Sequence, residues 1–240
     1  DGHVGLQSWY TDSKPYQVPL VAVNTSDQPL KVPGTVPPGR LVVHPQNKEG
    51  VGIAWRSPIA GRVRVSGSVQ DVHDECGDSV AWFVDRLGSG GLKPVANGAI
   101  QLKGTESIGA QEIEVKAGDF LQLAVMPKTS HGCDLTQVEW RIEEVGGKRR
   151  WDVADDVIGD FLKGNPLPDR LGNPAVWFFY QVDTDRGESF APTSPAELAK
   201  TDPAEVERSH TQNKRRLAEL RTQRAGMKSS ESEEFVYAAI

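Results

Sequence analysis

The chain has 240 residues, of which 38% are hydrophobic, and its 27 Lys and Arg against 33 Asp and Glu give a formal net charge of −6. This mild acidity gives no reason to expect a nucleic-acid partner, and no apolar run approaches the roughly 18 residues that a membrane span requires. The sequence opens with Asp1-Gly2-His3-Val4, without an initiator Met or a signal peptide. We therefore expect it to be a piece of a longer chain.

Short strands separated by turns dominate the first 145 residues. Apolar side chains alternate with polar or small ones over residues 51–56, 62–69, 80–85, 121–126 and 137–142. A period of two predicts strands with one buried face and one solvated face. Turn residues separate the runs, and the absence of interleaved helical patterns argues against a parallel sheet. We therefore predict a mainly β fold, an antiparallel jelly-roll-like β-sandwich.

The two faces of these strands carry different side chains. Trp55, Trp82 and Trp140 lie on the apolar face and are expected in the core. The other face is expected to be solvated, and it carries Arg56, Arg62, Arg64, Gln122, Glu139 and Arg141.

Changes in charge divide the chain into three segments. Residues 151–195 hold 3 basic and 8 acidic residues, whereas residues 196–230 hold 8 basic and 5 acidic ones. We place the sandwich at residues 1–148 and an acidic segment that packs on it at residues 149–193. Residues 194–240 are expected to form a helical connector to an absent domain, because a proline-led helix start is followed by only a thin apolar stripe.

Two elements are expected within the acidic segment. Residues 151–158 read as a short helix. Residues 176–180, Val-Trp-Phe-Phe-Tyr, read as a strand that is too apolar to be left in water and therefore packs back on the sandwich.

The two cysteines lie in polar loops, and each loop runs into a strand that carries a tryptophan. Trp82 follows Cys76 by six residues, and Trp140 follows Cys133 by seven. These similar offsets suggest that both loops emerge at the same end of the sandwich, and we predict a Cys76–Cys133 disulfide. Such a bond implies a periplasmic or extracellular location. Two unrelated reduced thiols are the alternative, and the spacing is too wide for a redox-active Cys-x-x-Cys pair.

The same two loops hold candidate metal ligands, namely His73, Asp74, Asp78, His131 and Asp134. Carboxylates with loop carbonyls suit Ca²⁺, and two histidines with an aspartate suit Zn²⁺. Ordinary turn chemistry is the alternative reading of these residues. We expect no cofactor in this chain apart from a candidate Ca²⁺, and the identity of any metal stays open.

Sugar recognition is a second interpretation of this end of the sandwich. Lectin-like sandwiches bind polyols with carboxylates, amides, arginines and an exposed aromatic ring. Because the three strand tryptophans are expected in the core, the freer aromatic candidates are Trp9, Tyr10 and Phe83. The candidate carbohydrate-binding residues are His73, Asp78, Phe83, His131 and Asp134.

Sequence signatures of catalysis are missing. The chain has no Gly-x-Ser-x-Gly elbow, no His-Glu-x-x-His pair and no phosphate-binding loop. It has no Cys-x-x-Cys-His site for a c-type haem, and no pair of carboxylates stands out as a glycosidase dyad. We therefore predict no catalytic residues and expect that the chain is not an enzyme.

Several motifs follow one another in an order typical of a known group of proteins. They are Val36–Arg40, Val42–Pro45, Val51–Gly67, Cys76–Trp82, His131–Thr136, Trp151–Ala154 and Gly172–Trp177. This order resembles the β-sandwich region of large secreted multidomain proteins of planctomycetes, which typically begin with a cytochrome c domain. Two family domains of unknown function follow in those proteins, and some carry carbohydrate-binding modules. The resemblance covers residues 36–180 and implies partner domains in the same parent chain and a role linked to polysaccharide use.

The sequence as a whole favours non-catalytic binding of a polysaccharide, anionic or complex, by one module of a larger secreted cytochrome c-linked protein. The first alternative is a structural spacer that positions the cytochrome and its partner domains. The second alternative is a glycan-active enzyme domain with carboxylates as acid and base. An open groove with an exposed aromatic residue would favour the binding module over both.

Overall fold

A computed structural model describes residues 4–10, 18–73, 75–88 and 91–183. These residues all belong to one unit of the chain, His3–Pro195. The helical connector predicted at residues 194–240 lies outside the described residues.

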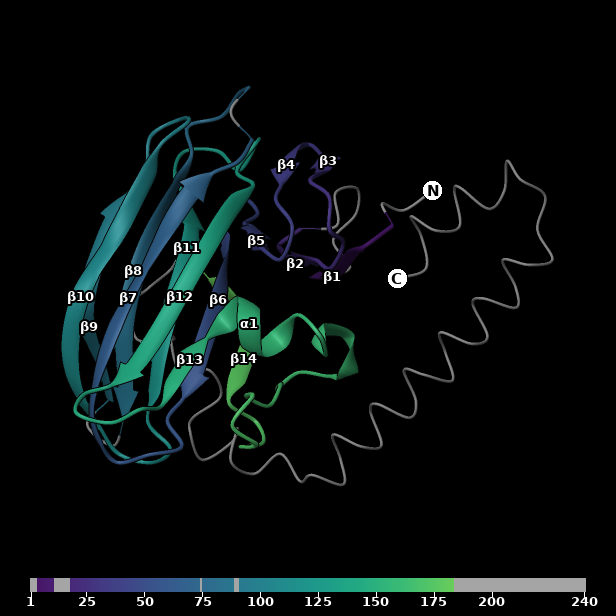
Figure 1. Cartoon of the computed structure of the whole chain (residues 1–240). Helices are drawn as coiled ribbons and strands as arrows, with labels where there is room; N and C mark the ends of the chain where they lie inside the picture. Colours follow the sequence, from purple (N-terminus) through teal and green to yellow (C-terminus); the bar gives the residue numbers. More distant parts are fainter. Residues whose placement is uncertain (1–3, 11–17, 74, 89–90, 184–240) are drawn as a thin grey trace. The chain divides into compact units, whose positions relative to one another are not determined.

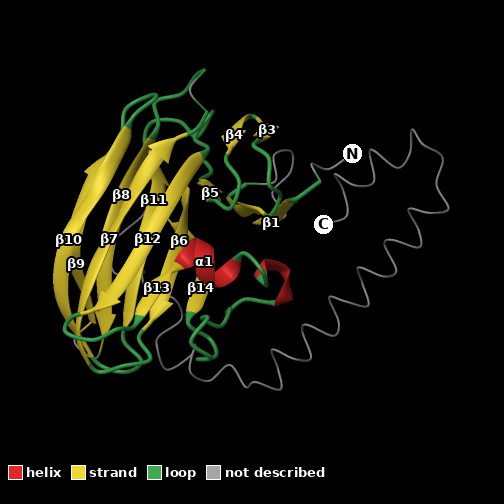
Figure 2. Cartoon of the chain, in the orientation of Figure 1, coloured by secondary structure: helices red, strands yellow, loops and turns green. Residues whose placement is uncertain are grey.

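The described residues form fourteen strands and two short helical elements. The strands are β1 (Leu6–Tyr10), β2 (Leu20–Asn24), β3 (Leu30–Val32), β4 (Gly34–Val36), β5 (Leu41–His44), β6 (Glu49–Arg56), β7 (Gly61–Asp71), β8 (Val80–Gly88), β9 (Gly91–Ala99), β10 (Thr105–Val115), β11 (Phe120–Pro127), β12 (Thr136–Glu144), β13 (Arg150–Asp152) and β14 (Trp177–Asp183). The helix α1 spans Val153–Val157, and a 3-10 turn, η1, spans Phe161–Lys163. Neither is long and apolar enough to cross a membrane. Figure 2 shows α1 beside β13 and β14.

Eight strands, β5 to β12, are divided equally between two antiparallel sheets, and the chain changes sheet at every connection except the β8–β9 hairpin. One sheet contains the order β5-β12-β7-β10, and the other contains β6-β11-β8-β9. This strand order is the double Greek key of a jelly roll, so the predicted sandwich is confirmed. Strands β2 and β1 extend the first sheet beyond β5, β13 pairs with β12, and β14 extends the second sheet beyond β6. Figure 1 shows the two sheets packed against each other.

Large aromatic side chains fill the space between the sheets. Trp55, Trp140, Trp151 and Trp177 have no exposed surface, and Trp82 is 3% exposed. The rings of Trp55 and Trp151 meet edge to face with their centroids 5.0 Å apart. The predicted core role of Trp55, Trp82 and Trp140 is therefore confirmed.

The expectation of one solvated face per strand is wrong for the central strands β6 and β11. Ala54, Gln122 and Ala124 face away from the inter-sheet core, yet each is at most 2% exposed. A second apolar cluster covers this face, in which Phe83 and Tyr180 pack against Ala124, Met126 and Val182. Apolar surface is therefore buried on the outer face of this sheet in addition to the inner face, and both contribute to stability.

A buried polar network crosses the same outer face. Gln122 donates to Asp85 Oδ2 over 3.0 Å and accepts a hydrogen bond from the Tyr180 hydroxyl. Burial, and then the charge of Asp85, raise the pKa of Tyr180. Gly52 makes room for the tyrosine ring, because a Cβ at this position would lie 2.5 Å from Cζ of Tyr180.

The acidic segment after residue 148 supplies strands to both sheets. Strand β13 pairs with β12, and β14 pairs with β6 along its whole length. The predicted short helix is confirmed as α1, and Asp152 caps its first turn by accepting from the Asp155 N–H. The predicted strand over residues 176–180 is confirmed as β14. The segment is therefore part of the same core as residues before 148.

Buried carboxylates fasten this segment to the tryptophans. Asp156 accepts hydrogen bonds from Trp177 Nε1 over 2.9 Å and from Arg170 Nε over 2.8 Å. Asp169 accepts from Trp151 Nε1 over 2.6 Å. Burial raises the pKa of Asp156, while its bonds with Arg170 and Trp177 oppose that shift. Asp156 and Asp169 therefore hold this segment against the core tryptophans.

Candidate functional site

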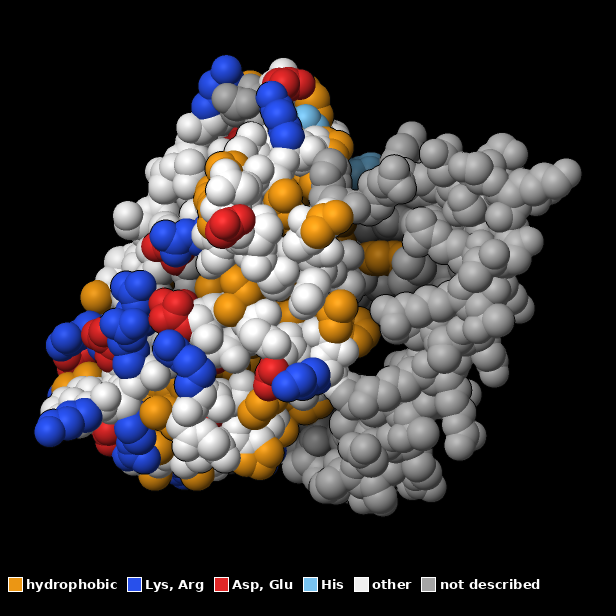
Figure 3. All heavy atoms as spheres, turned by 45° about the vertical axis from the view of Figure 1, so that its right-hand side comes forward, with side chains coloured by type: hydrophobic (Ala, Val, Ile, Leu, Met, Phe, Trp, Pro, Cys, Tyr) orange, Lys and Arg blue, Asp and Glu red, His pale blue; other side chains and the backbone are white. Residues whose placement is uncertain are grey.

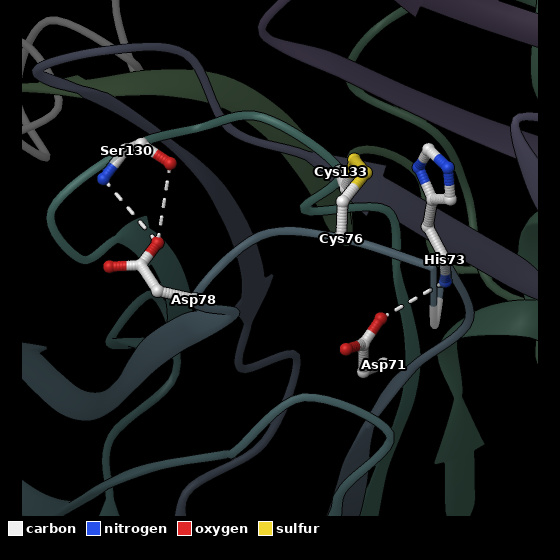
Figure 4. The surroundings of a disulfide bond; sticks show 6 residues. All are labelled: Asp71, His73, Cys76, Asp78, Ser130 and Cys133. Atoms are coloured by element: carbon white, nitrogen blue, oxygen red, sulfur yellow. Dashed lines mark hydrogen bonds between the residues drawn. A yellow bond between two sulfur atoms is a disulfide. The ribbon is translucent and has the colours of Figure 1, made fainter.

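The disulfide predicted from the sequence is present. Cys76 and Cys133 are bonded, with 5.6 Å between their Cα atoms. They join residues 72–79, between β7 and β8, to residues 128–135, between β11 and β12, and we call these two loops the disulfide rim (Figure 4). The jelly roll explains the meeting, because every second connection in it lies at the same end of the sandwich. The prediction that both loops share one end is therefore confirmed.

Two aspartates organise the rim through backbone amides. Asp78 accepts from the Thr129 N–H over 2.8 Å and from the Ser130 N–H over 3.4 Å, which ties one loop to the other. Burial acts to raise the pKa of Asp78, but these hydrogen bonds outweigh it and lower the pKa. Asp71, at the end of β7, accepts from the His73 N–H over 3.0 Å, as Figure 4 shows.

Asp134 is the unusual carboxylate of the rim. It is 1% exposed, and neither of its oxygens has a hydrogen-bond partner among the described residues. Burial raises its pKa to about 7, the charges of Asp78 and Asp71 add to the rise, and Lys128 opposes it. Ser79 Oγ and His73 Nδ1 are likewise buried without a partner in the described part of the chain.

Three histidines lie at this end of the sandwich, His44 at the end of β5 and His73 and His131 in the two loops of the rim. Burial lowers the pKa of His44, its contact with the Pro45 carbonyl opposes this, and the nearby His131 and His73 lower it further. Within the described residues, the single group of three ligand atoms that one ion could reach is His73 with Cys76 and Cys133, all within 4.8 Å. Both sulfurs are consumed by the disulfide, so this group offers no thiolate.

The predicted site residues do not all meet. His73, Asp78, His131 and Asp134 lie on the rim, and Asp74 lies outside the described residues. A Zn²⁺ site of two histidines and an aspartate is not assembled within the reach of one ion in the described residues. Phe83 lies in the middle of β8 opposite Ala124, on the outer face of the five-stranded sheet and away from the rim.

A cleft of about 210 Å³ lies elsewhere, between the edge strands of the two sheets. Strands β1 and β2 line it from one sheet, and β6 and β14 from the other. Its lining residues are Trp9, Tyr10, Pro19, Leu20, Val21, Val51, Asn165, Phe179, Tyr180 and Gln181. Trp9 and Tyr10, expected as freer aromatic residues, therefore do border a cleft. We call this the aromatic cleft.

Hydrogen bonds hold the walls of the aromatic cleft. Trp9 Nε1 donates to the Phe161 carbonyl over 2.9 Å, which fixes the indole on the wall. Asn165 Nδ2 donates to the Phe179 carbonyl over 2.6 Å, and Asn165 Oδ1 accepts from the Phe179 N–H over 3.0 Å. This amide occupies the edge of β14 as a further strand would. Gln181 is exposed at the cleft.

The sequence did not single out Asn165, Tyr180 or Gln181. Residues 165–168, Asn-Pro-Leu-Pro, had only the signature of a loop, and residues 176–180 only that of a strand. Their place in a cleft depends on the pairing of β14 with β6, which no local pattern announces.

A basic group of side chains marks the opposite end of the sandwich. Around the β12–β13 turn, a cleft of about 400 Å³ is lined by Arg64, Glu143, Glu144, Lys148, Arg149, Arg150 and the intervening turn residues. Figure 3 shows Lys and Arg side chains gathered on the lower part of the described surface. Arg149 pairs with Glu144 over 2.6 Å, and Arg64 pairs with Glu112 over 2.8 Å. These paired arginines fit a solvated surface better than a dedicated anion site.

Comparisons with models of known protein families, with curated proteins and with solved structures find no match for this chain. The fold, the disulfide rim and the aromatic cleft are therefore the observations on which a function has to rest.

Proposed function

We propose that this chain is a non-catalytic polysaccharide-binding module whose ligand binds in the aromatic cleft. The observation that carries the proposal is the lining of the cleft, in which the rings of Trp9 and Tyr10 lie beside the exposed Gln181. Sugar rings present apolar C–H faces, which pack on aromatic rings, together with hydroxyls that need polar partners. Sites for small ligands typically combine apolar and aromatic walls with a few polar groups in this way.

The composition of the cleft favours binding over hydrolysis. Glycoside hydrolysis uses two carboxyl groups on either side of the bond to be cut, about 5–10 Å apart. The described residues that line the aromatic cleft include no Asp or Glu. In the disulfide rim, Asp71 and Asp78 accept hydrogen bonds from backbone N–H groups and so hold the loops in place.

The proposal includes the setting of the module. A disulfide persists in oxidising compartments, so we place the chain in the periplasm or outside the cell. The family resemblance of residues 36–180 adds a parent chain with a cytochrome c domain and further partner domains. In that setting the module would hold the parent protein on its polysaccharide.

Affinity gel electrophoresis tests the proposal. The chain is run through native gels that contain one of a panel of plant and marine polysaccharides, including anionic ones. We expect at least one to retard the chain, and Trp9→Ala to abolish the retardation. Trp9→Phe should retain most of it, because a ring remains on the wall.

Two further variants separate loss of contact from loss of structure. Gln181→Ala removes an exposed polar group of the cleft and should weaken retardation. Leu102→Ala is the matched control, because Leu102 is 39% exposed and does not line the cleft. If no polysaccharide of a broad panel retards the chain, the spacer function replaces the proposal.

A further inference from the structure

The disulfide rim concentrates buried oxygen atoms that have no partner. Asp134 and Ser79 are 1% and 2% exposed, and neither Asp134 oxygen nor Ser79 Oγ has a hydrogen-bond partner in the described part of the chain. Native proteins satisfy nearly all buried polar groups, and a carboxylate is among the costliest to leave unpaired. Such a group therefore indicates where a ligand of opposite charge binds.

The neighbouring carboxylates cannot relieve Asp134. Both Asp71 and Asp78 are engaged by backbone N–H groups, and their charges oppose ionisation of Asp134. Lys128, the basic side chain that acts on Asp134, donates its ammonium hydrogen to the Ile100 carbonyl over 3.2 Å. Three negative groups thus face one committed lysine, and the local field favours a further cation.

Gly77 packs against the rim backbone beside Asp134. A Cβ at Gly77 would lie 2.4 Å from the Gly132 carbonyl oxygen, 3.3 Å from Cys133 Cβ and 3.4 Å from Asp134 Oδ1, so no side chain fits here. Gly77 also has a φ of +93°, a conformation that other residues rarely adopt. The Gly132 carbonyl oxygen and Asp134 Oδ1 therefore lie on the same side of Gly77.

We propose that the disulfide rim binds a Ca²⁺ ion, with Asp134 as its anchoring ligand and the Gly132 carbonyl as a neighbouring oxygen. Ca²⁺ takes six to eight oxygen ligands in irregular geometry and accepts carboxylates, carbonyls and water together. Zn²⁺ would require nitrogen or thiolate ligands. The rim sulfurs are bonded to each other, and His73 and His131 do not converge with an aspartate on one point.

Thermal unfolding of the oxidised 240-residue chain tests the site. The chain is stripped of metal with a chelator, and its Tm is measured with CaCl₂, MgCl₂ or ZnCl₂ at matched concentrations. We expect Ca²⁺ to raise the Tm in proportion to the logarithm of its concentration, because an ion that binds only the folded state stabilises it by mass action. Titration calorimetry with CaCl₂ should give a single-site isotherm.

Two variants decide whether Asp134 is the ligand. Asp134→Asn should fold and, in chelator, should be at least as stable as the wild type, but Ca²⁺ should leave its Tm unchanged. Glu75→Gln removes an exposed charge from the same loop and should keep the full response. A wild-type Tm that Ca²⁺ does not raise overturns the proposal, as does an equal rise in Asp134→Asn. A rise with Zn²⁺ alone would also overturn it.

Discussion

Removal of the disulfide gives the most quantitative test of the structure. The bond joins residues 57 apart, and the loop-entropy relation for this separation gives about 4 kcal/mol of stabilisation. Cys76 is exposed and Cys133 is half-buried, so serine at both positions sacrifices little packing. We therefore expect Cys76→Ser/Cys133→Ser to lose about 4 kcal/mol in the free energy of unfolding. In a domain of this size the Tm should fall by roughly 8–16 °C.

Urea unfolding in chelator measures the loss. Values extrapolated to water are compared, because opening the loop also expands the unfolded chain and alters the slope. The wild type under dithiothreitol is the matched control and should reproduce the double variant. A loss below about 1 kcal/mol, or no effect of the reductant, would refute the reasoning that the bond restricts a long loop of the unfolded chain.

Three further predictions concern the core and the rim. Trp82→Ala should destabilise by about 3–5 kcal/mol in urea unfolding, because Trp82 is 3% exposed and its indole donates to Glu106; an unchanged midpoint would contradict its place in the core. Gly67→Ala should cost about 1–3 kcal/mol or more, because its Cβ would lie 2.0 Å from the Glu139 carbonyl oxygen, whereas Gly109→Ala, with open space, should cost less. In chelator, stability should fall by up to roughly 4 kcal/mol from about pH 4 to about pH 7, since Asp134 ionises near 3.8 when unfolded and near 7 when folded. Asp134→Asn should lack this component, and identical pH profiles of the two proteins would show that Asp134 does not titrate in this range.

The strands and the meeting of the two cysteine loops could be predicted because their signals are local. Alternation marks each strand, and similar distances from cysteine to tryptophan mark two equivalent connections. The buried outer face of β6 and β11 could not be predicted in this way. Gln122 and Ala124 look like solvated positions until Tyr180 donates to Gln122 and, with Phe83, packs against Ala124, and Tyr180 belongs to a strand far along the chain.

The same limit applies to the candidate site. Trp9 and Tyr10 could be named as freer aromatic residues, but the opposite wall of their cleft comes from β14. The carboxylates of the rim could be named as a group because they flank the cysteines. Their division into amide-bound Asp71 and Asp78 and partnerless Asp134 depends on which way each loop turns. Side-chain direction in a loop has no periodic signal in the sequence.

The position of β14 has a consequence for biosynthesis. Strand β6 ends at Arg56, and the strand that completes its sheet begins at Trp177, about 120 residues later. At about 5–20 residues per second, the ribosome needs roughly 6–24 s to add that stretch. During this interval the edge of β6 that pairs with β14 has no strand to pair with, and an unpaired strand edge is a site at which chains can aggregate.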